Sequence, residues 1–397
     1  MRLALLALFS GGIFFQAHAL SETFATEGLN ESIGAQEMVN LEEFLAGQKE
    51  ENIQEFAKCV AKQINLEPVV YIKCASELVS AAGKCSSGDT IGCVLKVPSV
   101  VEKCYAPVTQ TFNAFVTCAK IKDVPPTQEL KIRLPEIKED QDLSVLVFGD
   151  SGKGTPEQFS NANGMKIFCK QNKCNMGLML GDNFYPNGVT SVNDKKFQTL
   201  FEVPYAPLNI PFYVALGNHD YQIGGNAQAQ VNYTQKSQIW NMPAKYYQFK
   251  IKETEFFVMD TNKILNDKNQ QTWLAASLAR STAKWKVVTG HHPIYSGGKH
   301  GTDPKMVDTI LPMLCQANVD FYLSGHDHHL EVSKSGCKTQ LVISGAAASI
   351  RDVNPTPQTV FAKDVIGFSH MLIGNDKITL RMVEQDNSEL FTTEFVK

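Results

Sequence analysis

Five short loops rich in glycine, aspartate and histidine lie between residues 149 and 329, and each follows a short apolar run. Their sequences are GDSG, GDNFY, GNHD, GHHP and GHDHH, at residues 149–152, 181–185, 217–220, 290–293 and 325–329. Carboxylate, amide and imidazole groups are ligands for hard and borderline metal ions, and glycine lets the backbone turn sharply where a strand ends. Seven of the nine histidines lie in or beside these loops: His219, His291, His292, His300, His326, His328 and His329. The loops together predict a metal-dependent active site.

The apolar runs before these loops indicate the elements that position them. Residues 144–148, 177–180, 212–216 and 321–323 are short and β-rich, and helix-like segments separate them. This alternation is typical of an α/β domain with its active-site loops at the ends of strands. We therefore expect a catalytic domain at residues 141–397.

The chain before residue 124 has a different character. Residues 24–121 are rich in alanine, glutamate and lysine, with apolar residues at helical spacing such as Ile53, Phe56 and Val60. Prolines at 125, 126 and 135 interrupt helices. We expect a helical, cysteine-rich domain at residues 20–123 and a linker at 124–140.

The N-terminal residues resemble a signal peptide. Arg2 precedes an apolar stretch at residues 3–15, and residues 17–19 form a small-x-small cleavage site, which predicts a signal peptide at 1–19. No second apolar stretch predicts a transmembrane segment. The 397-residue chain is 43% hydrophobic with a formal net charge of −4, so it has no basic excess for nucleic acid. We expect an exported globular protein.

Ten cysteines, an even number, favour an oxidising compartment. The six at 59, 74, 85, 93, 104 and 118 are spaced almost palindromically, which predicts a helical hairpin with nested bridges Cys59–Cys118, Cys74–Cys104 and Cys85–Cys93. Six cysteines allow about fifteen pairings, so other connectivities stay open. We also expect Cys169–Cys174 and Cys315–Cys337, and the sequons at Asn30 and Asn232 predict glycosylation.

The five loops, in order, resemble the GDxG, GDxxY, GNH(D/E), VxxH and GHxH motifs of the purple acid phosphatases, within the metallophosphoesterase superfamily. The fourth motif reads VTGH at residues 288–291, and the resemblance covers about residues 143–345. It implies two mixed β-sheets packed as a sandwich and flanked by helices. It also implies a binuclear centre of Fe(III) and a second divalent metal, iron, zinc or manganese, with a metal-bound hydroxide as nucleophile.

The resemblance also implies which residues hold the metals. Asp182 would bridge the two ions. The ferric ion would be held by Asp150, Tyr185 and His328, and the divalent ion by Asn218, His291 and His326.

Tyr185 decides between subfamilies. Most metallophosphoesterases carry histidine two residues after the first aspartate, but here that position is Gly152. A phenolate ligand suits Fe(III) better than zinc. The alternative interpretation of Tyr185 is a buried aromatic with a hydrogen-bonded hydroxyl group.

Further histidines surround the predicted ligands. His219 and His300 match histidines that bind substrate phosphate and protonate the leaving oxygen in the family, although His300 could instead stabilise its loop. We expect His292 and His329 to be exposed loop histidines, the alternative being that they line the pocket or lie behind the ligands.

The sequence therefore predicts an acid phosphatase, secreted or in a lysosomal or vacuolar lumen, that hydrolyses small phosphomonoesters or phosphoproteins. One alternative is a catalytically silent, phosphatase-like interaction protein, although all seven matched ligand positions are intact. Another is a metal-dependent phosphodiesterase or pyrophosphatase. The partner of the N-terminal domain stays unknown.

Overall fold

The computed structural model of the protein describes residues 132–397. The predicted signal peptide, the cysteine-rich domain with its three nested disulfides and the sequon at Asn30 lie outside the described residues. None of the helices in residues 132–397 is long and apolar enough to cross a membrane.

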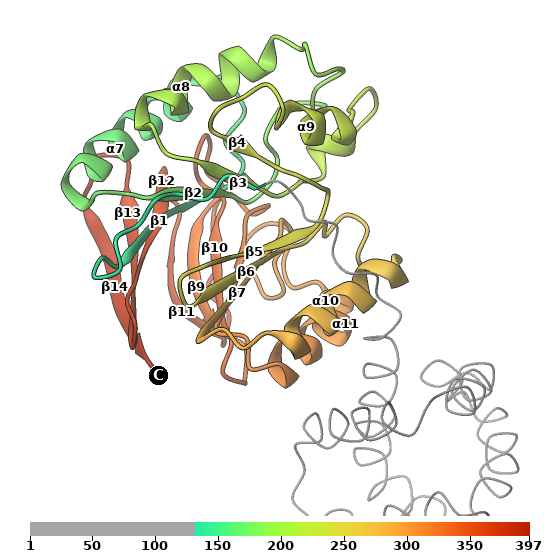
Figure 1. The fold of residues 1–397 in the computed structure, drawn as a ribbon, viewed down its shortest axis with the longest axis vertical. Helices are drawn as coiled ribbons and strands as arrows, with labels where there is room; N and C mark the ends of the chain where they lie inside the picture. The colour runs from blue at the N-terminus through green and yellow to red at the C-terminus, as the bar shows by residue number, and fades with distance from the viewer. Residues whose placement is uncertain (1–131) are drawn as a thin grey trace, which may run out of the picture. The chain divides into compact units, whose positions relative to one another are not determined.

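Two seven-stranded sheets form the centre of the fold (Figure 1). Sheet A has the spatial order β14 (Glu389–Val396), β13 (Lys377–Glu384), β12 (Gly367–Ile373), β1 (Leu143–Phe148), β2 (Met176–Met179), β3 (Phe212–Val214) and β4 (Trp240–Asn241). Sheet B has the order β11 (Thr359–Lys363), β9 (Leu330–Lys334), β10 (Gln340–Ser344), β8 (Phe321–Ser324), β7 (Trp285–Thr289), β6 (Thr254–Val258) and β5 (Tyr247–Ile251).

Both sheets are mixed, as the sequence predicts. Strands β1 to β4 are parallel, whereas β12, β13 and β14 extend sheet A in antiparallel fashion. In sheet B, β6, β7, β8 and β10 are parallel neighbours, with antiparallel strands at both edges. Because consecutive parallel strands need crossovers, helices connect them and cover the outer faces.

The hydrophobic core follows from strand alternation. In β7, Trp285 and Val287 point into the core shared by the two sheets, while Val288 packs in a second core with the helices over sheet B. Strand β1 is buried at all six positions, as expected for a strand covered on both faces. Packing on both faces therefore fixes the strand ends from which the loops begin.

Helices flank the sandwich on both sides (Figure 1). The helices beside sheet A are α7 (Pro156–Asn172), α8 (Val203–Tyr205) and α9 (Ala227–Tyr233), and those beside sheet B are α10 (Lys268–Arg280) and α11 (Pro304–Gln316). Single-turn or irregular helices occur at η1 (Phe197–Glu202), η2 (Ala206–Leu208) and η3 (His219–Tyr221). Thr155, Asp267 and Asp303 cap α7, α10 and α11 by accepting backbone N–H bonds.

The two disulfides expected in this part of the chain are present. Cys169 in the last turn of α7 is bonded to Cys174, and Cys315 at the end of α11 is bonded to Cys337. Asn232, in the second sequon, lies near the end of α9. Its side chain is exposed and therefore accessible to a glycan.

Candidate metal centre

The seven predicted ligands follow five strands whose carboxyl ends meet at one edge of the sandwich. Sheet A contributes the loops after β1, β2 and β3, and sheet B those after β7 and β8. Several contacts join the two sheets directly at this edge. The backbone N–H of His326 donates to Asp150 Oδ2 at 2.8 Å, and His291 Nε2 lies 3.4 Å from Asp182 Oδ1.

Asp150 and His328, two of the residues predicted to hold the ferric ion, lie close to the hydroxyl group of the third, Tyr185. This oxygen lies 3.0 Å from Asp150 Oδ1 and 3.3 Å from His328 Nε2. It also lies 2.9 Å from Asp182 Oδ2, the predicted bridging carboxylate. His328 Nε2 is 3.4 Å from Asp150 Oδ1, which closes the group. The hydroxyl group of Tyr185 therefore points toward the other predicted ligands.

The residues predicted to hold the divalent ion converge in the same way. His291 Nε2 lies 3.1 Å from Asn218 Oδ1 and 3.1 Å from His326 Nδ1. Asp182 lies between the two groups, because its Oδ2 atom contacts Tyr185 and its Oδ1 atom faces His291. Ligand atoms of Asp150, Asp182 and His291 all lie within 4.8 Å of one another, as a shared metal site requires.

Burial and neighbouring charges shift the pKa values of three residues of the centre. Burial raises the pKa of Tyr185 well above its usual value, and the neighbouring carboxylates Asp150 and Asp182 raise it further. Burial opposes ionisation of Asp182, but the charge of His291 and hydrogen bonds from His291 and His219 hold its pKa well below the usual range. Burial opposes protonation of His291, yet the charges of Asp182 and Asp150 raise its pKa to about 9.

This donor set fits the implied metals. Two carboxylates, a phenol oxygen and one imidazole surround the first position, which is the chemistry of a hard trivalent ion. Amide oxygen, two imidazoles and the shared carboxylate surround the second, which suits a divalent ion of intermediate softness.

Three predicted ligands have left-handed backbone conformations. The φ angles are 59° at Asp150, 51° at Asp182 and 69° at His326. Such conformations are uncommon outside glycine and cluster at functional sites. A glycine precedes each of the three, and a Cβ on the nearby Gly217 would lie 2.1 Å from the Asp182 nitrogen. The glycines of the motifs therefore let the ligand loops approach one another closely.

Partners behind the centre orient two of the imidazoles. His291 Nδ1 donates to the Leu180 carbonyl oxygen at 2.8 Å, which leaves Nε2 to face the centre. His328 Nδ1 lies 2.7 Å from Ser349 Oγ, which leaves its Nε2 atom facing Tyr185 and Asp150. Such partners fix the tautomer and ring orientation of a metal-binding histidine.

His219 and His300 lie at the more exposed rim of the centre. His219 Nδ1 lies 2.5 Å from the Pro186 carbonyl oxygen, and its Nε2 atom is 3.9 Å from Asp182 Oδ2. The His300 ring stacks on His326 with centroids 4.0 Å apart, and 38% of its side chain is exposed. Both rings are open to solvent and border the predicted ligands.

The expectation that His292 and His329 are exposed is wrong. His292 is largely buried, bonds through Nδ1 to Thr261 Oγ1 at 2.8 Å, and has its pKa lowered to about 3 by burial and the charge of His291. His329 is fully buried, 2.8 Å from Glu331 Oε2. The residues next to His292 in the sequence could not predict its burial, because its partner Thr261 lies 31 residues away.

Two buried carboxylates that the sequence analysis did not single out hold the His300 loop. Asp327 Oδ1 accepts from His300 N at 3.1 Å and lies 2.8 Å from His300 Nδ1. Glu331 Oε2 accepts from Gly297 N at 3.0 Å. Burial opposes ionisation of Glu331, but hydrogen bonds from His329, Thr359 and others keep its pKa below the usual value. Asp327 lies inside the GHDH motif, and this position could have identified it from the sequence as a residue of the site.

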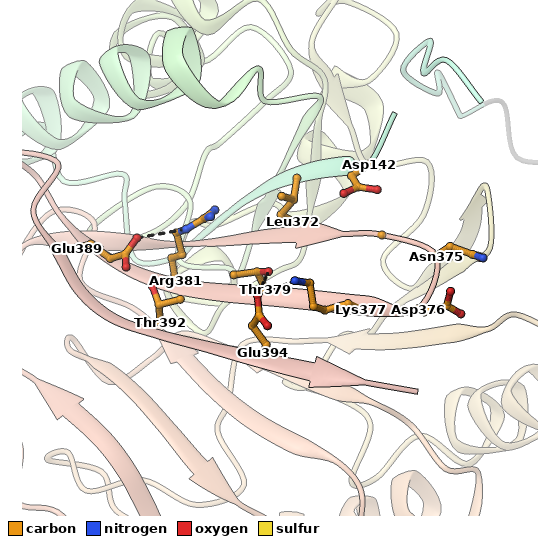
Figure 2. A pocket seen from close by; sticks show the side chains of 11 residues that line it. Asp142, Leu372, Asn375, Asp376, Lys377, Thr379, Arg381, Glu389, Thr392 and Glu394 are labelled. Carbon is orange, nitrogen blue, oxygen red and sulfur yellow. Dashed lines mark hydrogen bonds and ion pairs between the residues drawn. The ribbon is translucent and has the colours of Figure 1, made fainter. Parts of the chain in front are cut away.

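A cavity of about 570 Å³ lies away from this centre, on β12, β13 and β14 (Figure 2). Its charged side chains largely pair with one another, such as Arg381 with Glu389 at 3.2 Å and Lys377 with Glu394 at 2.7 Å. It contains none of the predicted ligands.

Comparisons with known proteins match the part of the chain that carries the predicted ligands. Residues 143–330 match the model of the calcineurin-like phosphoesterase family. The chain is 32% identical over 253 residues to tartrate-resistant acid phosphatase type 5 of Rattus norvegicus, covering 54% of this chain and 77% of the relative. It is 34% identical over 238 residues to purple acid phosphatase 7 of Arabidopsis thaliana, covering 53% and 72%.

A solved structure is also similar. GAP50, described as the anchor in the inner membrane complex of Plasmodium, matches with a TM-score of 0.59 and 25% identity, covering 65% of this chain and 90% of that one.

Proposed function

The chain belongs to the purple acid phosphatase family of calcineurin-like phosphoesterases and is a phosphoric monoester hydrolase, and we propose that it works through a binuclear Fe(III)–M(II) centre. The observation that carries this proposal is the Tyr185 hydroxyl group, which lies within 3.3 Å of atoms from Asp150, Asp182 and His328. A phenol among two carboxylates and an imidazole is a donor set for Fe(III).

The ligand assignment follows from the two groups. Asp150, Tyr185 and His328 would hold the ferric ion, and Asn218, His291 and His326 a divalent iron, zinc or manganese ion, with Asp182 shared. When bound, such a metal pair activates water and neutralises the phosphoryl oxygens.

The chain's own rim histidines bind and position the substrate. His219 is anchored through Nδ1 to the Pro186 carbonyl oxygen, so its Nε2 atom remains to contact a phosphoryl oxygen. His300 is anchored through Nδ1 to Asp327, so its Nε2 atom remains to deliver a proton to the leaving oxygen. Both atoms work from fixed rings, which lowers the entropic cost of catalysis.

The substrates and location follow from this chemistry and from the sequence. We propose small phosphomonoesters or phosphoproteins as substrates, in a secreted or lysosomal or vacuolar setting, with glycans at Asn232 and Asn30. The predicted signal peptide, the disulfides Cys169–Cys174 and Cys315–Cys337, and exposure of Asn232 support an exported protein.

Metal analysis and the visible spectrum test the proposal. A phenolate bound to Fe(III) absorbs visible light, so the purified protein should be purple or pink and contain about two metal ions per chain, one of them iron. Tyr185→Phe should remove the colour while iron remains bound. An iron-loaded wild type that is colourless in both redox states would contradict the assignment of Tyr185.

An activity comparison separates this proposal from its competitors. 4-Nitrophenyl phosphate should be hydrolysed much faster than bis(4-nitrophenyl) phosphate. The reverse preference would favour a phosphodiesterase. Full metal loading with no turnover of either ester would favour an anchoring role, which the similarity to GAP50 makes the main alternative.

A further inference from the structure

Helices α7 and α8 lie side by side over the outer face of sheet A (Figure 1). Gln158, in the first turn of α7, donates through Nε2 to the Leu200 carbonyl oxygen of η1 at 2.7 Å. Toward the other end of α7, Cys169 lines the same small cavity as Leu208 of η2. Helix α7 therefore runs alongside η1, α8 and η2, and we call these four elements the α7 layer.

The α7 layer exposes large apolar side chains to solvent. Phe159 and Ile167 on α7 are 40% and 43% exposed, and Val203 at the start of α8 is 61% exposed. The helices over sheet B, α10 and α11, carry none of the exposed large apolar side chains of residues 132–397. Single exposed apolar residues are common, so the informative observation is the difference between the two layers. It indicates that the α7 layer is the one suited to contact an apolar phase.

Three lysines lie on the same layer. Lys166 and Lys170 share the face of α7 that carries Phe159, because the three positions are spaced by seven and four residues. Lys173 follows as the C-cap residue. None of the three lysines forms an ion pair or a side-chain hydrogen bond with another described residue. The one acidic residue of α7, Glu157, lies in its first turn, so positive charge at the other end of the helix is uncompensated.

A small cavity lies beside these lysines. It has a volume of about 120 Å³ and is lined by Lys166, Lys170, Pro207, Leu208 and the disulfide-bonded Cys169 and Cys174. Cations in the last turn of a helix stabilise its dipole, but Lys166 lies before that turn and needs another explanation. Two ammonium groups beside an apolar wall suit a phosphate group that is attached to an apolar chain.

We propose that the α7 layer is a docking surface for an anionic lipid bilayer, with a headgroup phosphate in the cavity beside Lys166 and Lys170. This inference goes beyond the proposed function and does not depend on it. The lysines are attracted to the negative surface, and the exposed apolar side chains enter the boundary between headgroups and acyl chains. A purely acidic polymer would match the lysines but would offer no apolar phase to Phe159, Ile167 and Val203.

Vesicle sedimentation with the full-length, metal-loaded protein tests this surface. The protein should bind vesicles of phosphatidylcholine and phosphatidylserine, and should bind pure phosphatidylcholine vesicles much more weakly. Lys166→Gln combined with Lys170→Gln should lower the partition coefficient about 25-fold, which is roughly fivefold for each lysine. The matched control, Lys268→Gln combined with Lys305→Gln, removes two exposed charges from the helices over sheet B and should leave binding nearly unchanged. Equal circular dichroism spectra would verify that both double variants fold.

The apolar contact has its own readout. Ile167→Ser should weaken vesicle binding about fivefold. In Ile167→Trp, the emission of the new tryptophan should shift to shorter wavelength when anionic vesicles are added, because its ring leaves water. Equal vesicle binding by wild type and by the double variant of Lys166 and Lys170 would overturn the docking surface. Lysine-dependent binding to polyaspartate without binding to vesicles would also overturn it and would indicate an acidic protein partner.

Discussion

The two sheets contribute different donor atoms to the centre. The strand ends of sheet A supply only oxygen, from Asp150, Asp182, Tyr185 and Asn218, whereas those of sheet B supply only imidazole nitrogen. Oxygen ligands favour hard ions and imidazole favours softer ones. We therefore propose that sheet A mainly determines binding of the ferric ion, and that sheet B mainly determines the choice of the divalent ion.

Backbone hydrogen bonds from both sheets hold the carboxylates of sheet A. Carboxylates of sheet A accept backbone N–H bonds, such as those from His219 to Asp182 at 2.8 Å and from His326 to Asp150 at 2.8 Å. The second of these bonds comes from a residue of sheet B. The position of Asp150 therefore depends on contact between the two sheets.

Replacing the shared carboxylate should produce the largest effect. Asp182→Asn removes the one charge that faces both ligand groups, so we expect loss of both ions and a fall of about 10³-fold or more in kcat/KM. His326→Ala should instead lose only the divalent ion and keep the ferric colour. Metal content and the visible spectrum distinguish the two results.

The exposed Asp376, whose side chain is 72% accessible, provides the matched control, and Asp376→Asn should retain metal and activity. Loss of iron and colour in His326→Ala, to the same extent as in Asp182→Asn, would contradict a division of labour between the sheets.

The rim histidine from sheet B should affect catalysis without affecting metal content. If His300 delivers a proton to the leaving oxygen, His300→Ala should slow alkyl phosphates, which have poor leaving groups, by about 100-fold. Activated aryl phosphates should slow less than about tenfold, because their leaving groups need little protonation. Steady-state kinetics over a series of leaving groups measures this difference. Lys299→Gln controls for disturbance of the exposed loop, and equal losses for both ester classes would mean that His300 only shapes it.

Local patterns predicted the strands and the loops at their ends, and the resemblance to the purple acid phosphatases implied the two-sheet sandwich and the candidate ligands. The apolar run at residues 144–148 became β1, and glycines before Asp150 and Asp182 indicated sharp turns that the structure contains. What the sequence could not predict were pairings between distant residues. Ser349 behind His328 and Thr261 behind His292 come from other loops, and no periodicity links them.

The smallest expected effect concerns the acid stability of sheet A. His370 on β12 is fully buried, with Nε2 2.8 Å from Ser144 Oγ of β1 and Nδ1 3.2 Å from Arg381 Nη1. Burial and the Arg381 charge lower its pKa to about 3, whereas an unfolded histidine titrates near 6.5. The unfolded chain therefore binds a proton that the folded chain excludes, and stability falls as the pH drops below about 6.5.

This linkage gives a measurable difference between wild type and a variant. At pH 5 the loss amounts to about 2 kcal/mol in the free energy of unfolding relative to pH 7.5. His370→Gln keeps a polar side chain but cannot titrate, so its unfolding free energy should change less over this range by about that amount. Urea unfolding of metal-free protein at both pH values measures it, because bound metal would add its own pH dependence. Identical pH dependence in the two proteins would show that His370 does not make sheet A sensitive to acid.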